Sequence, residues 1–328
     1  MKALVTGAAG HLGEAMVRRL RLDGADVIGV DVSDSPTTTR QGSVADAELM
    51  ADVMRGVDVV WHTATLHKPH VATHSKQAFI ETNVSGTLVL LEAAVAEGVR
   101  AFVLTSTTSV YGDAMKPAAG APAVWVTESL APRPKNIYGV TKLAAEDLCR
   151  LFHRNHGLDC LVLRTSRFFP EEDDSETQRA GFSDENLKVN EFLYRRVDVG
   201  DVVDAHLCAA GRAPAIGHGL YIVSATTPFA EADVADLVTD PASVVERYVP
   251  HRELYAERSW SLPESFDRVY VNARARRELG WSPEWDFAAI LGKVRKGQGW
   301  RSETALSVGS KGYHPRTFDE VDGPYPVG

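Results

Sequence analysis

The sequence predicts an α/β protein built on a doubly wound parallel sheet, with a smaller domain toward its C-terminal side. Three observations lead to this prediction. Short apolar runs alternate with long amphipathic stretches up to about residue 170, as strands and helices do in a parallel sheet covered on both faces. A glycine-rich turn joins the first run to the first amphipathic stretch. Beyond residue 226 only short elements remain, separated by Pro, Gly and Trp.

The strands are predicted from apolar runs that are too short for helices. They cover residues 3–5, 26–30, 58–62, 101–104, 160–163 and 220–224. Apolar residues at helical intervals predict helices over residues 14–22, 46–54, 75–96, 137–153 and 197–210, with Asp46 as a cap and Gly98 and Gly157 as helix ends. Right-handed crossovers between such strands place ligands at the carboxyl ends of the strands.

The turn after the first strand has glycines at every third position, Gly7, Gly10 and Gly13. A pyrophosphate must approach such a turn closely, and a Cβ would block both the bend and the ligand. The N-terminus of the following helix then offers N–H groups and a positive dipole to the phosphates. A strand, a glycine turn and a helix in this order predict a dinucleotide site.

Asp31 closes the second strand, near the spacing at which an acidic residue meets an adenosine ribose. Its carboxylate can accept hydrogen bonds from both ribose hydroxyls, and it would repel a 2′-phosphate. We therefore predict NAD as the cofactor, bound by a Rossmann domain over residues 1–170 plus about 197–225. The substrate-binding region is predicted over about 171–196 and 226–328, which includes short elements at 274–279 and 287–295.

The composition sets further limits. The chain has 328 residues, 44% of them hydrophobic, and a net charge of −9, which argues against a general nucleic-acid surface. Three cysteines (Cys149, Cys160 and Cys208) fit buried thiols better than a disulfide framework or a metal site. The chain passes directly into a strand, and no run approaches the ~18 apolar residues of a membrane helix. We expect a soluble, cytoplasmic protein without membrane or nucleic-acid partners.

Tyr138 and Lys142 are four residues apart at the start of a predicted helix, so their side chains share one face. An adjacent ammonium and an oxidised nicotinamide would lower the pKa of the phenol. Tyr138 could then accept a proton from a substrate hydroxyl as hydride leaves the same carbon. Thr107 follows the fourth strand and can hydrogen-bond the oxygen that is oxidised.

With these residues the chain resembles an extended short-chain dehydrogenase/reductase of the nucleotide-sugar epimerase/dehydratase superfamily. The matching motifs span about residues 3 to 206: Thr6-Gly7-x-x-Gly10-x-x-Gly13, Asp31, Asp58-x-x-x-His62-x-Ala64, Thr82-Asn83-x-x-Gly86-Thr87, Ser106-Thr107 before Val110-Tyr111-Gly112, Tyr138-x-x-x-Lys142 and Val199-x-Asp201-Val202-x-x-Ala205-His206.

The resemblance implies that Tyr138 is the catalytic base, Lys142 holds the nicotinamide ribose and Thr107 orients the reacting hydroxyl. Asn83 would lie near the nicotinamide end, and Ser43 takes the place of an acidic residue that meets adenine. It also implies a homodimer formed through the two long helices. The implied cofactor-binding residues are Gly7, Gly10, His11, Leu12, Gly13, Asp31, Ser43, Val44, Thr63, Ala64, Asn83, Tyr138 and Lys142.

Departures from the family pattern concern the substrate. Family members that are 4,6-dehydratases have Asp-Glu directly after the catalytic Thr, where this chain has Thr108 and Ser109, which argues against dehydration. Arg167 replaces a usual Asn, and about 28 residues separate Pro170 from Val199, where nucleotide-sugar enzymes have many more. These differences argue against a UDP-sugar.

The loop after the third strand contains His67, Lys68, His70 and His74. One hypothesis is that Lys68, His67 and Arg167 hold a carboxylate or phosphate of the substrate, beside Thr108. A basic surface loop and a metal site formed by the histidines are alternatives, although the histidine spacing fits no common ligand pattern. We interpret the acidic cluster at 171–176 as a solvated loop or the start of a helix. The sequence does not decide how the tail from residue 309 to residue 328 runs.

The sequence therefore predicts an NAD-dependent oxidoreductase that removes hydride from a secondary alcohol carbon of a sugar or sugar acid. A sugar or nucleotide-sugar epimerase that retains its cofactor is the alternative. A non-catalytic NAD sensor is a third reading, and the presence of Thr107, Tyr138 and Lys142 argues against it.

Overall fold

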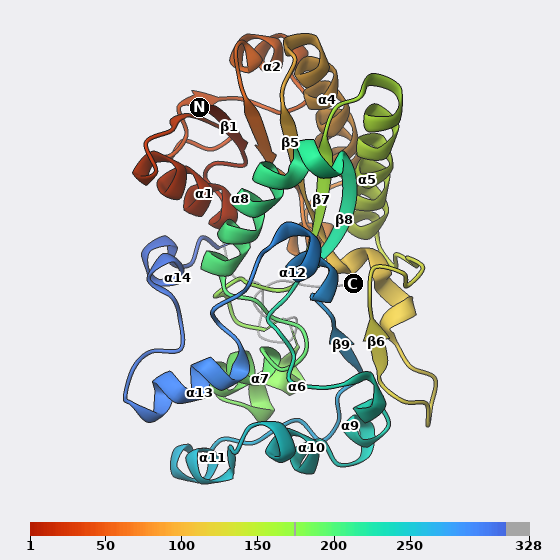
Figure 1. Cartoon of the computed structure of the whole chain (residues 1–328), viewed down its shortest axis with the longest axis vertical. Coiled ribbons are helices and arrows are strands. Elements are labelled where there is room, and N and C mark those ends of the chain that lie inside the picture. Colours follow the sequence, from red (N-terminus) through yellow and green to blue (C-terminus); the bar gives the residue numbers. More distant parts are fainter. Residues whose placement is uncertain (174, 313–328) are drawn as a thin grey trace.

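The computed structural model describes residues 1–173 and 175–312. In this part of the chain the core is a seven-stranded sheet in the order β3-β2-β1-β4-β5-β7-β8 (Figure 1). All neighbouring pairs are parallel, so the predicted fold class is confirmed. The strands are β1 (Lys2–Thr6), β2 (Asp26–Asp31), β3 (Arg40–Gln41), β4 (Val59–His62), β5 (Ala101–Thr107), β7 (Cys160–Thr165) and β8 (His218–Val223).

Helices cover both faces of the sheet, because successive residues of each strand point to opposite faces. Ala3 and Val5 of β1 belong to a core cluster that includes α1 (His11–Leu22) and α8 (Val199–Ile216). Leu4 belongs to a second cluster that includes α2 (Ala47–Met54), α4 (Gly86–Glu97) and α5 (Ile137–His156). Asp46 caps α2 and accepts a hydrogen bond from the Leu49 backbone, as predicted.

The chain leaves β1 toward β2 on one side and returns to β4 on the other. Such a reversal of strand order opens a crevice at the carboxyl ends of the central strands. The fold therefore places a ligand crevice between the ends of β1 and β4.

The helical stretch predicted over residues 75–96 consists of three pieces. A short α3 (Lys76–Phe79) leads into a π-helix (Ile80–Ser85), and α4 follows and ends at Gly98 in the left-handed conformation. The region Lys76–Glu97 is the one helical stretch among the described residues that is long and apolar enough to cross a membrane by length and composition. Because 44% of its most apolar window is buried inside the protein, a core helix explains the same pattern.

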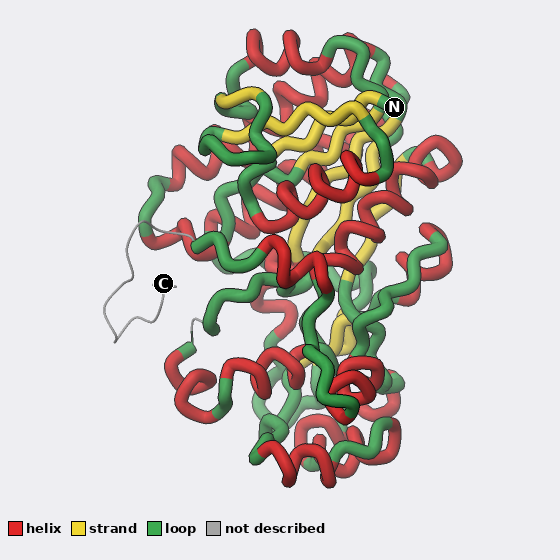
Figure 2. The backbone as a smooth tube through the Cα atoms, turned by 90° about the vertical axis from the view of Figure 1, so that its left-hand side faces the viewer, coloured by secondary structure: helices red, strands yellow, loops and turns green. Residues whose placement is uncertain are grey.

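The second unit lies beyond the carboxyl edge of the sheet (Figures 1 and 2). Its parallel pair of strands, β6 (Val124–Val126) and β9 (Arg268–Tyr270), is too short to be recognised in the sequence. Its helices share a separate hydrophobic cluster that includes Phe192, Phe229, Leu254 and Phe287. The helices of this unit are α6 (Glu176–Gly181), α7 (Asp184–Glu191), α9 (Asp236–Thr239), α10 (Pro241–Tyr248), α11 (Arg252–Arg258) and α13 (Phe287–Arg295).

The two units exchange segments across the boundaries predicted from the sequence. The strand β6 belongs to the second unit although it precedes residue 170. In the other direction, α12 (Ala273–Leu279) and α14 (Glu303–Val308) return to α8 on the sheet. Asp198 and Asp201 at the start of α8 hold this return, because Asp198 accepts a hydrogen bond from Ser302 Oγ at 2.6 Å and Asp201 accepts bonds from the backbones of Glu284 and Trp285.

Candidate active site

A cavity of about 850 Å³ runs along the carboxyl ends of the strands, from the glycine turn to Tyr138 and into the second unit. It is within the range of roughly 300–1,000 Å³ that is typical of small-molecule sites. Most residues predicted for the cofactor and the substrate line it. They are Gly7, Gly10, His11, Leu12, Gly13, Asp31, Ser43, Val44, Thr63, Ala64, His67, Lys68, Thr107, Thr108, Tyr138 and Arg167.

The glycine turn at one end of the cavity is closely packed. Gly7 has φ +72°, and a Cβ there would lie 2.7 Å from the Ala64 nitrogen. A Cβ on Gly13 would lie 1.8 Å from the Gly7 carbonyl oxygen. Gly10 precedes α1, and no side chain caps this helix. The turn and the open helix start thus have the geometry that brings a phosphate against backbone N–H groups.

Asp31 is fixed at the end of β2. One carboxylate oxygen accepts a hydrogen bond from the Ala9 backbone at 3.0 Å, and the other accepts one from the Ser33 backbone at 2.9 Å. The carboxylate thus faces the cavity beside the glycine turn, held by backbone from both sides. This position agrees with the predicted contact to a ribose.

Tyr138 lies in the first turn of α5, which is capped by Asn136 through a 3.1 Å bond from the Gly139 backbone. Burial raises the pKa of Tyr138 to about 12, against the opposing effect of its hydrogen bond with Thr107. The sequence argument anticipated a lowered pKa, and in this structure the direction is opposite because desolvation of the phenolate outweighs that hydrogen bond. Tyr138 and Thr107 both line the cavity, so the structure brings the predicted base and the predicted hydroxyl to one site.

Lys142 is one helical turn further along α5 and is 1% exposed. Burial lowers its pKa to about 8, and the carboxylate of Glu146, another turn along, acts in the opposite direction. Glu146 receives two hydrogen bonds from Arg164 at 3.0 and 2.6 Å and one from Ser106. A buried, fully paired carboxylate therefore stands behind the predicted catalytic lysine.

Two predicted cofactor residues do not line the cavity. Lys142 is one, and Asn83 in the π-helix is the other. The Asn83 amide accepts bonds from Thr65 and the Leu66 backbone and donates to Leu66 and Thr141. Asn83 therefore ties the loop after β4 to helix α5.

The histidine loop lies directly beside Tyr138. The ring of His67 stacks on Phe169 at 5.3 Å and meets the Tyr138 ring edge-on at 6.5 Å. His70 lies against His67 at 4.6 Å between ring centroids. Among the described residues, no group of three potential ligands is placed to hold a metal ion. The histidines thus lie in the cavity wall, where they can meet a substrate.

Arginines gather where the second unit closes the cavity. Arg167, which replaces the usual Asn, is paired with Asp173 and also lies 3.4 Å from Glu191. Glu191 further binds Arg195 at 2.8 Å and Arg196 at 2.6 Å. Burial alone would raise the pKa of Glu191, but the three guanidinium groups, Arg195 foremost, hold it at about 2.

Sequence reasoning did not assign Arg195 and Arg268 to the site, yet both line the cavity. Arg195 adjoins the position of a basic residue in the family pattern, which was a usable signal. Arg268 lies in β9, whose three residues offered no motif.

The acidic cluster predicted as a solvated loop is partly buried, so that interpretation is wrong for two of its residues. Asp173 is 5% exposed and pairs with Arg167. Glu171 binds His11 Nε2 at 2.8 Å, Ser310 Oγ at 2.8 Å and the Lys311 backbone at 3.0 Å. Burial opposes ionisation, but these bonds, that of His11 first, lower the pKa of Glu171 to about 2. The tail beyond residue 312 lies outside the described residues.

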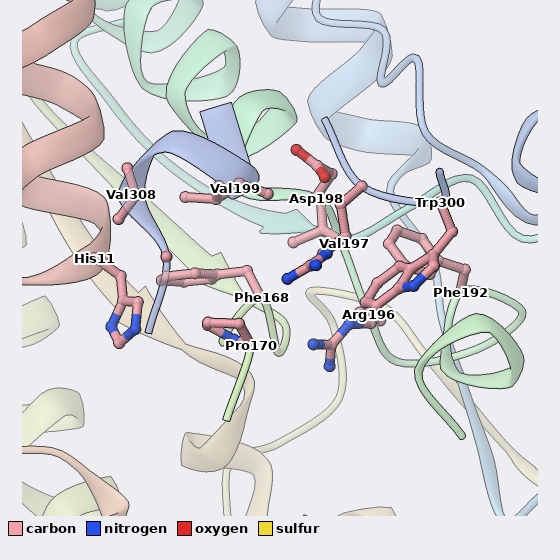
Figure 3. A pocket seen from close by; sticks show the side chains of 13 residues that line it. His11, Phe168, Pro170, Phe192, Arg196, Val197, Asp198, Val199, Trp300 and Val308 are labelled. Atoms are coloured by element: carbon pink, nitrogen blue, oxygen red, sulfur yellow. The ribbon is translucent and has the colours of Figure 1, made fainter. Parts of the chain in front are cut away.

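A second, much smaller cavity lies beside the first, between the start of α1 and helix α14. Figure 3 shows His11 and Val308 at one end and Phe192 and Trp300 at the other. Its volume of about 20 Å³ is little more than the space that one water molecule needs. We interpret it as a packing gap.

Comparison with known proteins identifies relatives along the whole fold. A family model described as "NAD dependent epimerase/dehydratase family" matches residues 3–223. A protein of Streptomyces antibioticus named dTDP-glucose 4,6-dehydratase is 30% identical, over 90% of this chain and 91% of the relative. A protein of Streptomyces lividans named UDP-glucose 4-epimerase is 26% identical, over 97% of this chain and 98% of the relative.

Among solved structures, a short-chain dehydrogenase/reductase superfamily protein from Agrobacterium tumefaciens with bound NAD has a TM-score of 0.65 and 25% identity. The match covers 90% of this chain and 96% of that protein. This chain therefore shares its overall fold with a protein whose structure contains bound NAD.

Contrary to the expectation from the sequence, 4,6-dehydration is not excluded for this chain. The expectation rested on Thr108 and Ser109 in place of an Asp-Glu pair, yet a 30% identical relative is named as a dehydratase. Two positions cannot exclude the reaction, because acid and base can come from another wall of the same cavity.

Proposed function

This chain is a member of the NAD dependent epimerase/dehydratase family, and from that premise we propose that it removes hydride from a secondary alcohol carbon of an anionic sugar. The observation that supports the proposal most strongly is that Tyr138 and Thr107 line the same cavity as the glycine turn and Asp31. Mere binding of a dinucleotide requires no such pair at the other end of the cavity.

NAD is the cofactor of the family, and the residues present fit it. The backbone of the Gly7–Gly13 turn has no room for side chains, and Asp31 is oriented beside it. We assign the pyrophosphate to this turn and the adenosine ribose to Asp31. Bound NAD would supply the hydride acceptor and a positive ring that favours the phenolate of Tyr138.

The residues around Tyr138 then divide the proton chemistry. Thr107 holds the oxygen of the reacting alcohol, and Tyr138 accepts its proton. The ammonium group of Lys142, one helical turn from Tyr138, adds positive charge that favours the phenolate. The carboxylate of Glu146 favours this ammonium form of Lys142. Once Tyr138 has accepted the proton of the alcohol, the same hydroxyl can return a proton to a carbonyl oxygen.

The charge distribution supports an anionic substrate. Among the described residues of the cavity wall, the carboxylates are Asp31 and Asp34, both at the glycine-turn end. The rest of the wall carries Lys68 and three arginines, Arg167, Arg195 and Arg268, which are paired with Asp173, Glu191 and Asp267 outside the wall. Such a wall attracts a carboxylate, a phosphate or a nucleotide diphosphate on the substrate. We propose a sugar acid or a sugar bearing phosphate groups.

The fate of the hydride distinguishes the two candidate reactions. A dehydrogenase releases the oxidised sugar, whereas an epimerase returns hydride to the opposite face and keeps its cofactor. The relative named UDP-glucose 4-epimerase supports keeping the second candidate. We further propose a homodimer, because Val140 and Leu151 on α5 are 50% and 38% exposed and would be covered by a partner helix.

The test uses the purified full chain with NAD and three probes, UDP-glucose, dTDP-glucose and glucuronic acid. NADH absorbance detects net or transient reduction, and NMR identifies the product. The variant Tyr138→Phe should lower turnover by about 100-fold or more with little change in the Kd of NAD. Tyr248→Phe serves as the matched control, because Tyr248 is 43% exposed on α10, away from the cavity. Full turnover in Tyr138→Phe would refute the assignment.

A further inference from the structure

His67 is held against the proposed catalytic tyrosine from several directions. Its ring stacks on Phe169 with an interplanar angle of 26°, and its edge contacts are to Tyr138 and to His70. These three neighbours come from different parts of the chain: the segment after β7, helix α5 and the helical turn after His67. A ring packed in this way has a defined position in the cavity wall.

The loop backbone reinforces this position. The His67 N–H donates to Nδ1 of His70 at 3.0 Å, so Nδ1 of His70 acts as the acceptor. Pro69 is buried in the first turn of the 3₁₀-helix (Lys68–Ala72) that follows His67. Ring contacts continue outward from His70 to His74 at 5.1 Å. His67 is therefore the innermost member of a row of imidazoles that ends at Tyr138.

The side chains beside Tyr138 differ chemically from those at the glycine-turn end of the cavity. The carboxylates in the described wall, Asp31 and Asp34, both lie after β2 at the far end. Beside Tyr138 the wall offers hydroxyls, cations and imidazoles, and of these the imidazole exchanges a proton most readily near neutral pH. His67 is the imidazole whose ring lies against that of Tyr138.

We propose that His67 is a second acid–base residue of the site, which moves a proton at the carbon next to the one that Tyr138 serves. This inference rests on the proposed function. Once the alcohol is a ketone, its hydride having gone to NAD and its proton to Tyr138, the adjacent C–H bond is acidified. His67 takes that proton, and the electron pair of the C–H bond forms an enolate. The negative charge of the enolate falls on the oxygen that Tyr138 and Thr107 hold.

The enolate can end in two ways with balanced chemistry. His67⁺ can exchange its proton with solvent and return a solvent proton to the same face of the carbon, which exchanges that position without inverting it. Alternatively it can protonate a hydroxyl on the next carbon, which leaves as water while the electron pair of the enolate forms a C=C bond conjugated with the ketone. In the first case the carbon takes up a solvent proton, which a simple epimerisation at the oxidised carbon does not require; in the second the carbon-bound proton leaves with the water. The imidazole of His67 thereby supplies the acid–base function that the hydroxyls of Thr108 and Ser109 cannot supply.

The experiment measures deuterium uptake from D2O into UDP-glucose, dTDP-glucose or glucuronic acid by NMR, together with a single-turnover burst of NAD reduction. Two variants are compared: His67→Gln, which removes the imidazole, and His67→Phe, which keeps a ring to stack on Phe169. His156→Gln is the control, because His156 lies at the end of α5 far from the cavity. Near-native melting temperatures show that the variants are folded.

We expect wild type and His156→Gln to incorporate deuterium next to the oxidised carbon. Both His67 variants should lose at least about 100-fold of this exchange while their burst amplitude stays within a factor of about three. Exchange that survives in both variants, with only KM raised, would make His67 a substrate anchor and overturn the inference. A wild-type burst without any exchange would also overturn it and leave the proposed function intact. No NAD reduction by wild type with any probe would overturn the proposed function, and this inference with it.

Discussion

Glu191 offers the sharpest test of the electrostatics in the second unit. Its carboxylate is 1% exposed and faces Arg195, Arg196 and Arg167, at distances of 2.8, 2.6 and 3.4 Å. These guanidinium groups hold its pKa at about 2, below the ordinary value of 4.5. Because the folded pKa is lower than the unfolded one, the ionised carboxylate stabilises the fold above pH 4.5. That stabilisation is lost as the pH falls from 4.5 toward 2.

The size of the effect follows from the same two values. At about 1.4 kcal/mol per pKa unit, the difference between 4.5 and about 2 corresponds to roughly 3 kcal/mol of unfolding free energy. About 2 kcal/mol of this is already lost at pH 3. The variant Glu191→Gln has no such proton, and it leaves the buried Arg196 and the partly buried Arg167 and Arg195 without their shared partner. We expect it to be destabilised at pH 7 by about 3–5 kcal/mol.

The assay is urea unfolding of wild type and Glu191→Gln at pH 7, 5 and 3. The difference between the two free energies of unfolding should stay constant from pH 7 to 5 and shrink by about 1–2 kcal/mol at pH 3. Taking the difference removes the contribution of other carboxylates that titrate in both proteins. If the difference is the same at pH 7 and pH 3, Glu191 does not have a lowered pKa and the argument fails.

Two further variants test the cofactor end of the cavity. Asp31→Ala should lower the ratio of NAD to NADP affinity by about tenfold or more, because it removes the charge that would repel a 2′-phosphate. Titration of the protein with both dinucleotides measures this ratio. An unchanged ratio would show that Asp31 does not contact the ribose. Gly13→Ala should abolish NAD binding in calorimetry, since its Cβ would lie 1.8 Å from the Gly7 oxygen. Gly211→Ala, where a Cβ meets nothing within 4 Å, is the control and should bind NAD normally. Normal NAD affinity in Gly13→Ala would show that the turn does not hold the phosphates.

Local patterns in the sequence predicted the fold and many of the residues that line the cavity. The glycine turn, Asp31 and the Tyr138–Lys142 spacing each lie within one strand–turn–helix unit or one helix, so their geometry is fixed by neighbours in the chain. The burial that raises the pKa of Tyr138 could not be predicted in this way, because burial depends on the complete tertiary structure.

The contacts that the sequence could not predict join distant segments. Glu171 meets His11 and the backbone of Lys311, and nothing in an acidic run distinguishes such a carboxylate from a solvated one. Arg268 reaches the cavity only because β9 pairs with the three-residue β6. Its role depends on a long-range pairing for which these short strands carry too little pattern.

The pairing of β6 with β9 connects the second unit to the segment after Thr107. Val124 pairs with Arg268 and Val126 with Tyr270, and the Tyr270 hydroxyl reaches Met115 Sδ, at the end of the helical turn that follows Thr107. The part of the cavity wall that comes from β9 is thus connected to the segment after Thr107 by a few side chains, while helix α5 is anchored separately on the sheet. Substitutions along β6 and β9 could therefore reshape this wall and leave the position of Tyr138 unchanged.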